Sequence, residues 1–320
     1  MTKIFIIGAT GHIGGAVLDL VYPKYPDVHI KALVRDEKKG KILVGKYPRV
    51  TFVVGDLTSL DLLTGEAKEA DVVINTGPDV KQDVAISAIL EGSANHSSKA
   101  YYIHTVGSSL IWDSPGSSSQ NEQKIFDDVL DIQALKSFPP AALHATSNAP
   151  SSPPPSSTAS LPPLLSAITT TQSGFTISPT TNLQSHIHVL DLAQIYLSPL
   201  LRAQRRISRS SKMGPGSLLF RCIGRSFFRR IHVSKPPYKL VHDTQIKTLS
   251  FSEAVKVVGT LTAYLFGINM QVRCTRAKEV LGWVPWAKKV EEGLDEVLEV
   301  YYRERDDGAG MQELDDTYGL

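Results

Sequence analysis

The feature that most constrains this chain is a glycine-rich turn close to its start, in the stretch IFIIGATGHIGGAV from Ile4 to Val17. The apolar run before Gly8 is too short for a helix and is typical of a strand buried on both faces. Gly11 and Gly14 follow at intervals of three residues, and a helical pattern begins directly after them. A strand that turns through glycines into a helix leaves backbone amides free at the helix N-terminus, where they favour phosphate groups. The stretch therefore predicts an α/β fold that begins with a nucleotide-binding turn.

Each glycine has a separate mechanical task in such a turn. Gly8 permits the tight exit from the strand, Gly11 leaves room for a pyrophosphate against the backbone, and Gly14 lets the helix pack close to the sheet. We expect the residues between them to contact a bound dinucleotide as well, namely Thr10, His12 and Ile13.

The first hundred residues alternate between short apolar runs and helical patterns. The runs predict strands over 3–8, 29–35, 50–56, 71–77 and 100–109, and helices fit over 12–23, 60–70 and 81–97, the first of them stopped by Pro23. Repeated strand–helix–strand units predict a doubly wound parallel sheet with right-handed crossovers.

Residues that end the other strands are candidates for the rest of the dinucleotide site. After the second strand of such sheets, an acidic side chain binds a ribose 2′-hydroxyl, whereas an arginine accommodates a 2′-phosphate. Here Arg35 comes first and Asp36 next, so the sequence favours NADP over NAD while Asp36 leaves NAD open. Further candidates follow the third and fourth strands: Asp56, Leu57, Asn75, Thr76 and Gly77.

The regular pattern stops in a segment rich in Ser, Thr and Pro over 145–180. Proline breaks helices and removes ladder donors, so we expect this segment to be irregular or disordered. A short strand and a helix with Asp191 as its N-cap are predicted over 186–201, and further helices over 251–267 and 290–305. We therefore expect a Rossmann-type nucleotide domain over 1–200 and a smaller, mixed C-terminal substrate lobe over 201–320.

Composition narrows the classes of partner. The formal net charge is only +2 with 21% charged residues, which gives no argument for nucleic acid. No apolar run approaches the roughly 20 residues of a membrane span, and no export signal opens the chain, so we expect no membrane partner and a cytoplasmic location. The basic stretch over 202–230 is either a solvated loop or a site for an anionic group.

The small number of cysteines favours a reducing compartment. The spacing of the cysteines and histidines predicts no metal site. The two cysteines, Cys222 and Cys274, lack metal-ligand spacing. His186, His188 and His242 have no cysteine or carboxylate at ligand spacing.

Several motifs together resemble the short-chain dehydrogenase/reductase superfamily, in its extended or atypical branches. The stretches IIGATGHIGGAV, LVRD, GDL and VINTG carry the resemblance in the first half. HIHVLDLAQIYL resembles the H-V-D-D-L-A segment of extended members, with Leu190 in place of the first aspartate, and CTRAKEVLGWVPW resembles their A-x-x-x-L-G-W-x-P signature. The resemblance is to the NAD-dependent epimerase/dehydratase-like group, with NmrA-like proteins close behind, and it is absent over 145–180.

The last of these signatures has a mostly structural interpretation. Leu281, Trp283 and Trp286 are expected to form an apolar cluster that docks the C-terminal lobe, with Gly282 allowing the bend. Arg273 and Arg276 are either the solvated start of a helix or ligands for an anionic substrate group.

The resemblance implies a catalytic tyrosine and lysine four residues apart on one helix, where the lysine lowers the pKa of the tyrosine. No tyrosine of this chain has a lysine four residues later, and the helix expected to carry the pair, over 121–135, contains no tyrosine. What remains is a group of hydroxyls after the fifth strand, Thr105, Ser108 and Ser109, which are candidate catalytic residues, although Ser108 and Ser109 are more simply turn residues. His104 beside them is more simply a packed strand residue.

Three interpretations of function stay open. The first is an NAD(P)-dependent oxidoreductase or epimerase/dehydratase-like enzyme with atypical catalytic residues, acting on a small carbonyl, alcohol or sugar-like metabolite. The second is a non-catalytic sensor of NADP(H) of NmrA-like type that reports to a regulatory protein partner. The third is a family member damaged over 145–180 by an altered reading frame. A homodimer is compatible with each of them.

Overall fold

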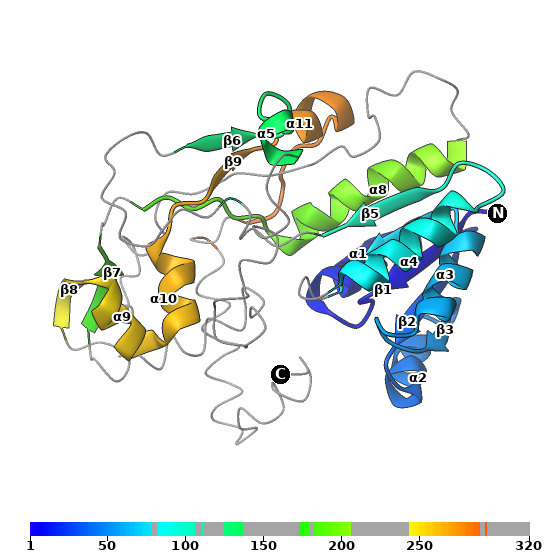
Figure 1. Cartoon of the computed structure of the whole chain (residues 1–320), viewed down its shortest axis with the longest axis horizontal. Helices are drawn as coiled ribbons and strands as arrows, with labels where there is room; N and C mark the ends of the chain where they lie inside the picture. The colour runs from blue at the N-terminus through cyan, green and yellow to red at the C-terminus, as the bar shows by residue number, and fades with distance from the viewer. Residues whose placement is uncertain are drawn as a thin grey trace.

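The structure is a computed structural model that describes residues 1–77, 82–105, 111, 124–136, 173–178, 182–205, 243–288 and 292. Five parallel strands form its central sheet, in the order β3-β2-β1-β4-β5 (Figure 1). They are β1 (Lys3–Ile7), β2 (His29–Val34), β3 (Val50–Val54), β4 (Val72–Asn75) and β5 (Tyr101–His104). The predicted parallel sheet is confirmed.

Helices cover both faces of this sheet. They are α1 (His12–Lys24), α2 (Glu37–Lys46), α3 (Leu60–Glu69), α4 (Asp83–Ala94) and α8 (Val189–Arg205). Successive residues of a strand face opposite ways, and β1 shows the result. Ile4 and Ile6 pack in a core that includes residues of α1 and α8, whereas Phe5 and Ile7 pack in one that includes α3 and α4. The sheet is therefore the middle layer of three.

A smaller lobe holds two short parallel strand pairs. β6 (Ile125–Asp127) pairs with β9 (Gln271–Arg273), and β7 (Ser173–Ile177) pairs with β8 (Asp243–Leu249). The helices α9 (Phe251–Val258) and α10 (Thr260–Gly267) share a core with β7. The lobe thus uses strands from both sides of residue 200, the boundary expected from the sequence.

Helix α8 contributes to two cores. Ala193, Tyr196 and Leu197 lie in the core between α1 and the sheet. Ile195 lies in a different cluster, with Trp283 and with Ala277 of α11 (Thr275–Leu281). The same helix therefore joins the five-stranded half to the C-terminal segment.

The prediction of a helix over 121–135 is wrong. Residues 125–127 form β6, a turn follows, and only Ile132–Lys136 are helical, as α5. The reason is Asp127, whose Oδ1 accepts the amide hydrogens of Val129 and Leu130 at 2.8 and 3.0 Å. A side chain that takes up these amides favours a turn over a helix.

The helix expected over 251–267 is divided in two at Gly259. This glycine has a φ of +79°, in the left-handed region, so it ends α9 and begins α10. Ser250 caps α9 in a capping box with Glu253. The helix predicted over 290–305 lies outside the described residues, except for residue 292.

Three further expectations need correction. Helix α1 continues through Pro23 to Lys24. Asp191 is not an N-cap but lies inside α8, which begins at Val189, and residues 186–188 form no strand. The segment 145–180 is not irregular throughout, because β7 lies within it, paired with β8; residues 145–172 lie outside the described residues.

The end of α11 agrees with the sequence in part. Gly282 takes the left-handed conformation with φ +62°, and Trp283 is buried with Leu281 packed against its cluster. Trp286 does not join that cluster, since 61% of it is exposed. Its backbone is fixed instead, because Asp191 Oδ1 accepts the amide hydrogens of Trp286 and Ala287 at 2.9 and 3.3 Å.

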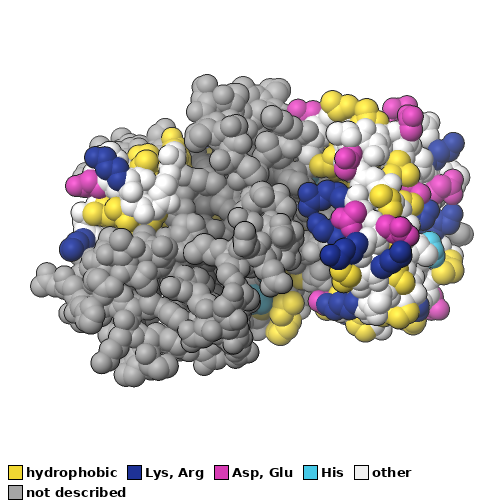
Figure 2. All heavy atoms as spheres, turned by 90° about the horizontal axis from the view of Figure 1, so that it is seen from below, with side chains coloured by type: hydrophobic (Ala, Val, Ile, Leu, Met, Phe, Trp, Pro, Cys, Tyr) yellow, Lys and Arg dark blue, Asp and Glu magenta, His cyan; other side chains and the backbone are white. Residues whose placement is uncertain are grey.

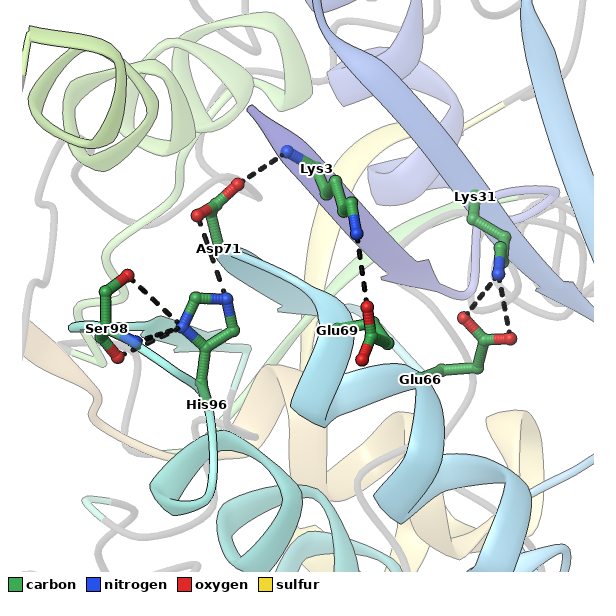
Figure 3. A network of polar contacts seen from close by, with 7 residues as sticks. All are labelled: Lys3, Lys31, Glu66, Glu69, Asp71, His96 and Ser98. Carbon is green, nitrogen blue, oxygen red and sulfur yellow. Dashed lines mark hydrogen bonds and ion pairs between the residues drawn. The ribbon is translucent and has the colours of Figure 1, made fainter. Parts of the chain in front are cut away.

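A polar network closes the edge of the sheet at which the strands begin (Figure 3). The Lys3 amide donates to Asp71 Oδ2 at 2.8 Å, and the Lys3 ammonium pairs with Glu69 at 3.1 Å. His96 Nδ1 accepts the amide hydrogen of Ser98, and its other ring nitrogen lies 3.8 Å from Asp71. This edge is occupied by internal contacts, so the opposite edge is the one to examine for a ligand.

Among the described helices, none combines the length and the apolar character that crossing a membrane requires.

Candidate functional site

The carboxyl edge of the sheet brings residues from distant parts of the chain into one row. Ile7 is level with Asn75, and Asn75 with His104. The residues that follow these strands, Gly8, Thr76 and Thr105, therefore lie in register. The chain leaves β1 through α1 toward β2 and leaves β4 through α4 toward β5, on opposite faces of the sheet, and such a switch point is where open α/β sheets bind ligands.

The glycine turn is built as its spacing predicts. Gly8 has a φ of +83°, and a side chain there would meet Thr76 atoms at 2.7–2.8 Å. A Cβ on Gly14 would stand 2.1 Å from the Gly8 carbonyl oxygen, so α1 lies directly against the turn. The Thr76 hydroxyl donates to the Ile7 carbonyl at 2.9 Å and ties the end of β4 to the end of β1.

Gly11 differs from these two glycines in its surroundings. It is the N-cap of α1 with extended backbone, and among the described residues a Cβ there would meet only the Gly8 carbonyl oxygen, at 3.3 Å. As a glycine, this N-cap has no side chain that could cap the helix end. The first amides of α1 consequently face an exposed surface formed by Thr10, Gly11 and His12, while the Ile13 side chain packs on the core.

His12 adds a titratable ring to this surface. Partial burial lowers the pKa of His12, and the neighbouring ring of His188, which precedes α8, lowers it further. His188 Nδ1 accepts the Leu190 amide hydrogen at 3.2 Å. Both helices thus begin at this edge, each with a histidine at its start.

Arg35 and Asp36 follow β2 on one side of the glycine turn. Arg35 is exposed, and Val34, directly before it, is level with Val54 of β3. Asp36 is the N-cap of α2, and its Oδ1 accepts the Lys39 amide hydrogen at 2.7 Å. The Asp36 carboxylate, because of which the sequence does not decide between NAD and NADP, thus already accepts a hydrogen bond from its own helix.

Asp56 and Leu57 follow β3, one strand farther out. Asp56 Oδ1 accepts hydrogen bonds from the Thr58 amide at 2.8 Å and the Thr58 hydroxyl at 2.6 Å. These bonds lower the pKa of Asp56. Leu57 packs on the core shared with α3 and α4. Asp56 is therefore a charged group at the rim of the edge, held by its own loop.

The three candidates after β4 have different surroundings. Asn75 is fully buried: its amide nitrogen donates to Gln82 at 3.1 Å and to the Tyr102 hydroxyl at 3.2 Å. Asn75 Oδ1 accepts the Gly77 amide hydrogen at 3.0 Å. Asn75 thus shapes the loop from inside, and Thr76 and Gly77 are the partly exposed residues of the group.

Thr105 is the one candidate catalytic hydroxyl within the described residues, since Ser108 and Ser109 lie outside them. Its amide donates to the Asn75 carbonyl at 3.0 Å, which fixes it at the sheet edge. Its hydroxyl is hydrogen-bonded to the hydroxyl of Tyr196, from α8. His104 is stacked on Tyr102 with ring centres 5.9 Å apart, as expected of a packed strand residue.

Sequence reasoning missed Tyr196 as a site residue. The sequence offers Tyr196 only as the first member of a tyrosine–lysine pair, and Leu200 stands where the lysine would be. The apolar periodicity of α8, with Ala193 and Leu197 on the same side, is the signal that turns Tyr196 toward the sheet. That it meets Thr105, 91 residues earlier, follows only from the fold.

The remaining candidates do not gather at this edge into a metal site. Within the described residues, no three or more His, Cys, Asp or Glu side chains are grouped so that they could hold a metal ion. Cys274 is buried in the cluster with Trp283. Arg273 is exposed at the end of β9, and the Arg276 amide donates to Asp128 at 3.0 Å.

Comparison with known proteins agrees with this geometry. Residues 1–95 match the model of the NmrA-like family. The oxidase ucsJ from Acremonium sp is 33% identical over 142 residues, which are 43% of this chain and 40% of the oxidase. The alignment thus spans less than half the length of this relative.

Two solved structures share the fold along nearly the whole chain. The Citrobacter sp. triphenylmethane reductase complexed with NADP(H) has a TM-score of 0.58 at 13% identity, over 92% of this chain and 99% of its own. The dTDP-glucose 4,6-dehydratase from Bacillus anthracis in complex with NAD has a TM-score of 0.56 at 13% identity, over 96% and 98%. These findings agree with the resemblance drawn from the motifs: residues 1–95 are NmrA-like in sequence, and the chain shares the Rossmann-type fold of both solved structures.

Proposed function

We propose that this protein binds NADP(H) along the carboxyl edge of its sheet and is an oxidoreductase for a small carbonyl, alcohol or sugar-like metabolite. The observation that carries the proposal is the row formed by the glycine turn, Thr76 and Thr105, beside the start of α1, whose N-cap is a glycine without a capping side chain. When bound, the coenzyme supplies or accepts a hydride, and the protein supplies orientation and charge.

The residues present fit a dinucleotide. Neighbouring strands lie about 5 Å apart, so Thr105 is two strand spacings, about 10 Å, from the glycine turn on one side. Arg35 and Asp56 lie one and two spacings away on the other side. A pyrophosphate on the amides of α1 would thus have its adenosine half over β2 and β3 and its nicotinamide half over β4 and β5.

The preference for NADP rests on the residues after β2. Asp36 is engaged as the N-cap of α2, whereas Arg35 is exposed and Lys38, one turn later, is exposed as well. A cationic side chain beside a helix N-terminus favours a 2′-phosphate over a 2′-hydroxyl. On the face that Figure 2 shows, Lys and Arg of this half of the molecule lie among Asp and Glu.

The first experiment measures coenzyme binding. Calorimetric titration of the protein with NADPH and NADH should give tighter binding of NADPH, and Arg35→Ala should narrow the ratio of the two dissociation constants. The exposed Lys24, at the far end of α1, offers the matched control Lys24→Ala. An unchanged ratio in Arg35→Ala removes Arg35 from the site, and absence of binding by either coenzyme overturns the proposal.

The second experiment separates an enzyme from a sensor. The absence of a tyrosine–lysine pair is the observation that favours a non-catalytic NADP(H) sensor that reports to a protein partner. Purified protein and NADPH are incubated with aldehydes, ketones, quinones and nucleotide sugars, and oxidation of NADPH is followed at its absorbance. Turnover of any of these supports the oxidoreductase, whereas tight coenzyme binding without turnover favours the sensor.

A further inference from the structure

The hydrogen-bonded hydroxyls of Thr105 and Tyr196 connect the protein core to the candidate site. Thr105 is half-buried and directly follows β5, in line with Thr76 and Gly8. Two contacts hold it: its amide donates to the Asn75 carbonyl, and its hydroxyl bonds to Tyr196. Its backbone and its side chain are therefore both fixed at the edge.

Tyr196 reaches this edge from inside the molecule. Only 4% of the residue is exposed, and it packs in the core between α1 and the sheet. It stands seven residues after Val189, where α8 begins, which is about 10 Å along the helix axis. Helical side chains lean toward the helix N-terminus, so the ring points back toward the carboxyl edge.

Either hydroxyl can donate in this hydrogen bond, and the chemistry of the two groups favours Tyr196 as the donor. Burial raises the pKa of Tyr196, although the bond with Thr105 acts in the opposite direction, so the phenol keeps its proton at neutral pH. A phenol is a more acidic donor than an aliphatic alcohol. When Tyr196 donates to Thr105 Oγ1, the hydrogen of the Thr105 hydroxyl is directed elsewhere, and its bond to a ligand is strengthened by the first one.

We infer that Tyr196 is a positioning residue, which holds Thr105 so that the Thr105 hydroxyl donates a hydrogen bond to a carbonyl oxygen at the nicotinamide end of the site. The inference rests on the proposed function, because that function defines this end of the edge. Tyr196 thus supports the Thr105 hydroxyl in a chain whose sequence has no tyrosine–lysine pair on one helix.

The experiment detects the hydrogen bond without requiring turnover. Protein saturated with NADP+ is mixed with acetophenone or benzaldehyde labelled with ¹³C at the carbonyl, and the carbonyl resonance of the bound probe is recorded by NMR. A hydrogen bond to the oxygen moves this resonance downfield. We expect Thr105→Ala to abolish the shift, Tyr196→Phe to reduce it, and Thr105→Ser to retain it. We also expect Tyr196→Phe to weaken probe binding about threefold or more, the range of one neutral hydrogen bond.

Tyr47→Phe is the matched control, because Tyr47 is also buried in this core and also loses a hydroxyl contact, to Asp19 at 2.6 Å. It lies just before β3 begins, at the opposite edge, and should leave the probe resonance unchanged. Circular dichroism establishes whether each variant is folded. If Tyr196→Phe is not folded, the comparison of Thr105→Ala with Thr105→Ser tests whether the Thr105 hydroxyl makes the hydrogen bond to the probe.

The outcomes separate this inference from the function beneath it. If calorimetry shows no NADP+ binding, the proposed function fails and the inference with it. If NADP+ binds but neither probe shows a bound resonance, or Tyr196→Phe leaves the shift as in the unchanged protein, the inference alone is overturned. A shift lost in Thr105→Ala and reduced in Tyr196→Phe, but not in Tyr47→Phe, supports it.

Discussion

Two glycines of the same turn have opposite surroundings, although their spacing in the sequence treats them alike. Gly14 is pressed against the Gly8 carbonyl, so it serves the packing of α1 on the sheet. Gly11 is exposed, with a backbone conformation open to other residues. One therefore belongs to the fold, and the other to the surface that a phosphate would approach.

This difference predicts two distinct mutant phenotypes. Gly11→Val should lower the melting temperature less than Gly14→Ala but weaken NADPH binding at least tenfold, about 1.4 kcal/mol, because the side chain occupies the space of the pyrophosphate. Gly14→Ala should destabilise the protein by about 1–3 kcal/mol or more, since its methyl group overlaps the Gly8 carbonyl. Thermal unfolding and calorimetric titration of both variants check this. Equal loss of stability in the two would contradict it.

At the residue scale, the sequence predicts which positions reach the carboxyl edge, because each follows a strand. It does not predict which side chains are already engaged. Asn75 and Asp36 have the right chemistry for a ligand, but internal hydrogen bonds hold both of them. The bond of Asp36 to the Lys39 amide has the ordinary N-cap spacing and becomes certain only once the start of α2 is known, whereas no spacing rule places Gln82 beside Asn75.

Among the elements, α8 is tied to the C-terminal segment through Asp191. Its carboxylate accepts two backbone hydrogen bonds and is 1% exposed. Asp191→Ala would remove the acceptor of these amides in a partly buried place, and we expect a loss of about 1–3 kcal/mol in the free energy of unfolding. Asp191→Asn keeps an acceptor oxygen and should cost less than half of that. Urea unfolding followed by circular dichroism measures both, and equal losses would refute the assigned role.

The break between α9 and α10 gives a second prediction at this scale. Gly259→Ala meets no atom within 4 Å, but its φ of +79° strains any side chain, so we expect a loss of about 1–2 kcal/mol. The control is Gly65→Ala, in the exposed part of α3, where nothing lies within 4 Å either and the helical backbone suits alanine. That variant should gain about 0.5–1 kcal/mol. The opposite signs would appear as opposite changes in melting temperature.

The sequence predicts the five strands of the central sheet and the helices α1, α3, α4 and α8, because buried parallel strands and amphipathic helices differ in period, but it does not predict α2. It fails where one side chain redirects the backbone. Asp127 takes up the amides that would begin a helix, and Gly259 divides a continuous helical pattern. The partners of the short strands β6 and β7 lie far along the chain, so local periodicity contains no trace of them.

For the whole molecule, Asp127 predicts how stability depends on pH. Burial acts to raise the pKa of Asp127, but hydrogen bonds from the Thr275 hydroxyl and from the Leu130 and Val129 amides outweigh it, and the pKa is lowered. A folded-state pKa below the unfolded one adds stability above the ordinary carboxyl range, near pH 4, and this stability is lost as the pH falls through the folded value.

The test compares urea unfolding at pH 6 and pH 3. The unchanged protein should lose more unfolding free energy between these values than Asp127→Asn, which has no charge to lose. The Thr275 hydroxyl, which donates to Asp127 Oδ2 at 2.6 Å, gives a second variant, Thr275→Val, that should flatten the dependence in part. Parallel pH curves for all three proteins would show that Asp127 makes no such contribution.

Helix α8 has one further consequence for the molecule. Tyr196 and Leu197 face the five-stranded half, whereas Ile195, directly before them, packs with Trp283 and its neighbours. If α8 separated from one of these two cores, apolar side chains of the other core would also become exposed to water. Neither core can therefore unfold alone. Heat should therefore unfold the sheet and residues 271–283 in a single cooperative step, and a coenzyme held at the sheet edge should slow hydrogen exchange in that distant segment as well.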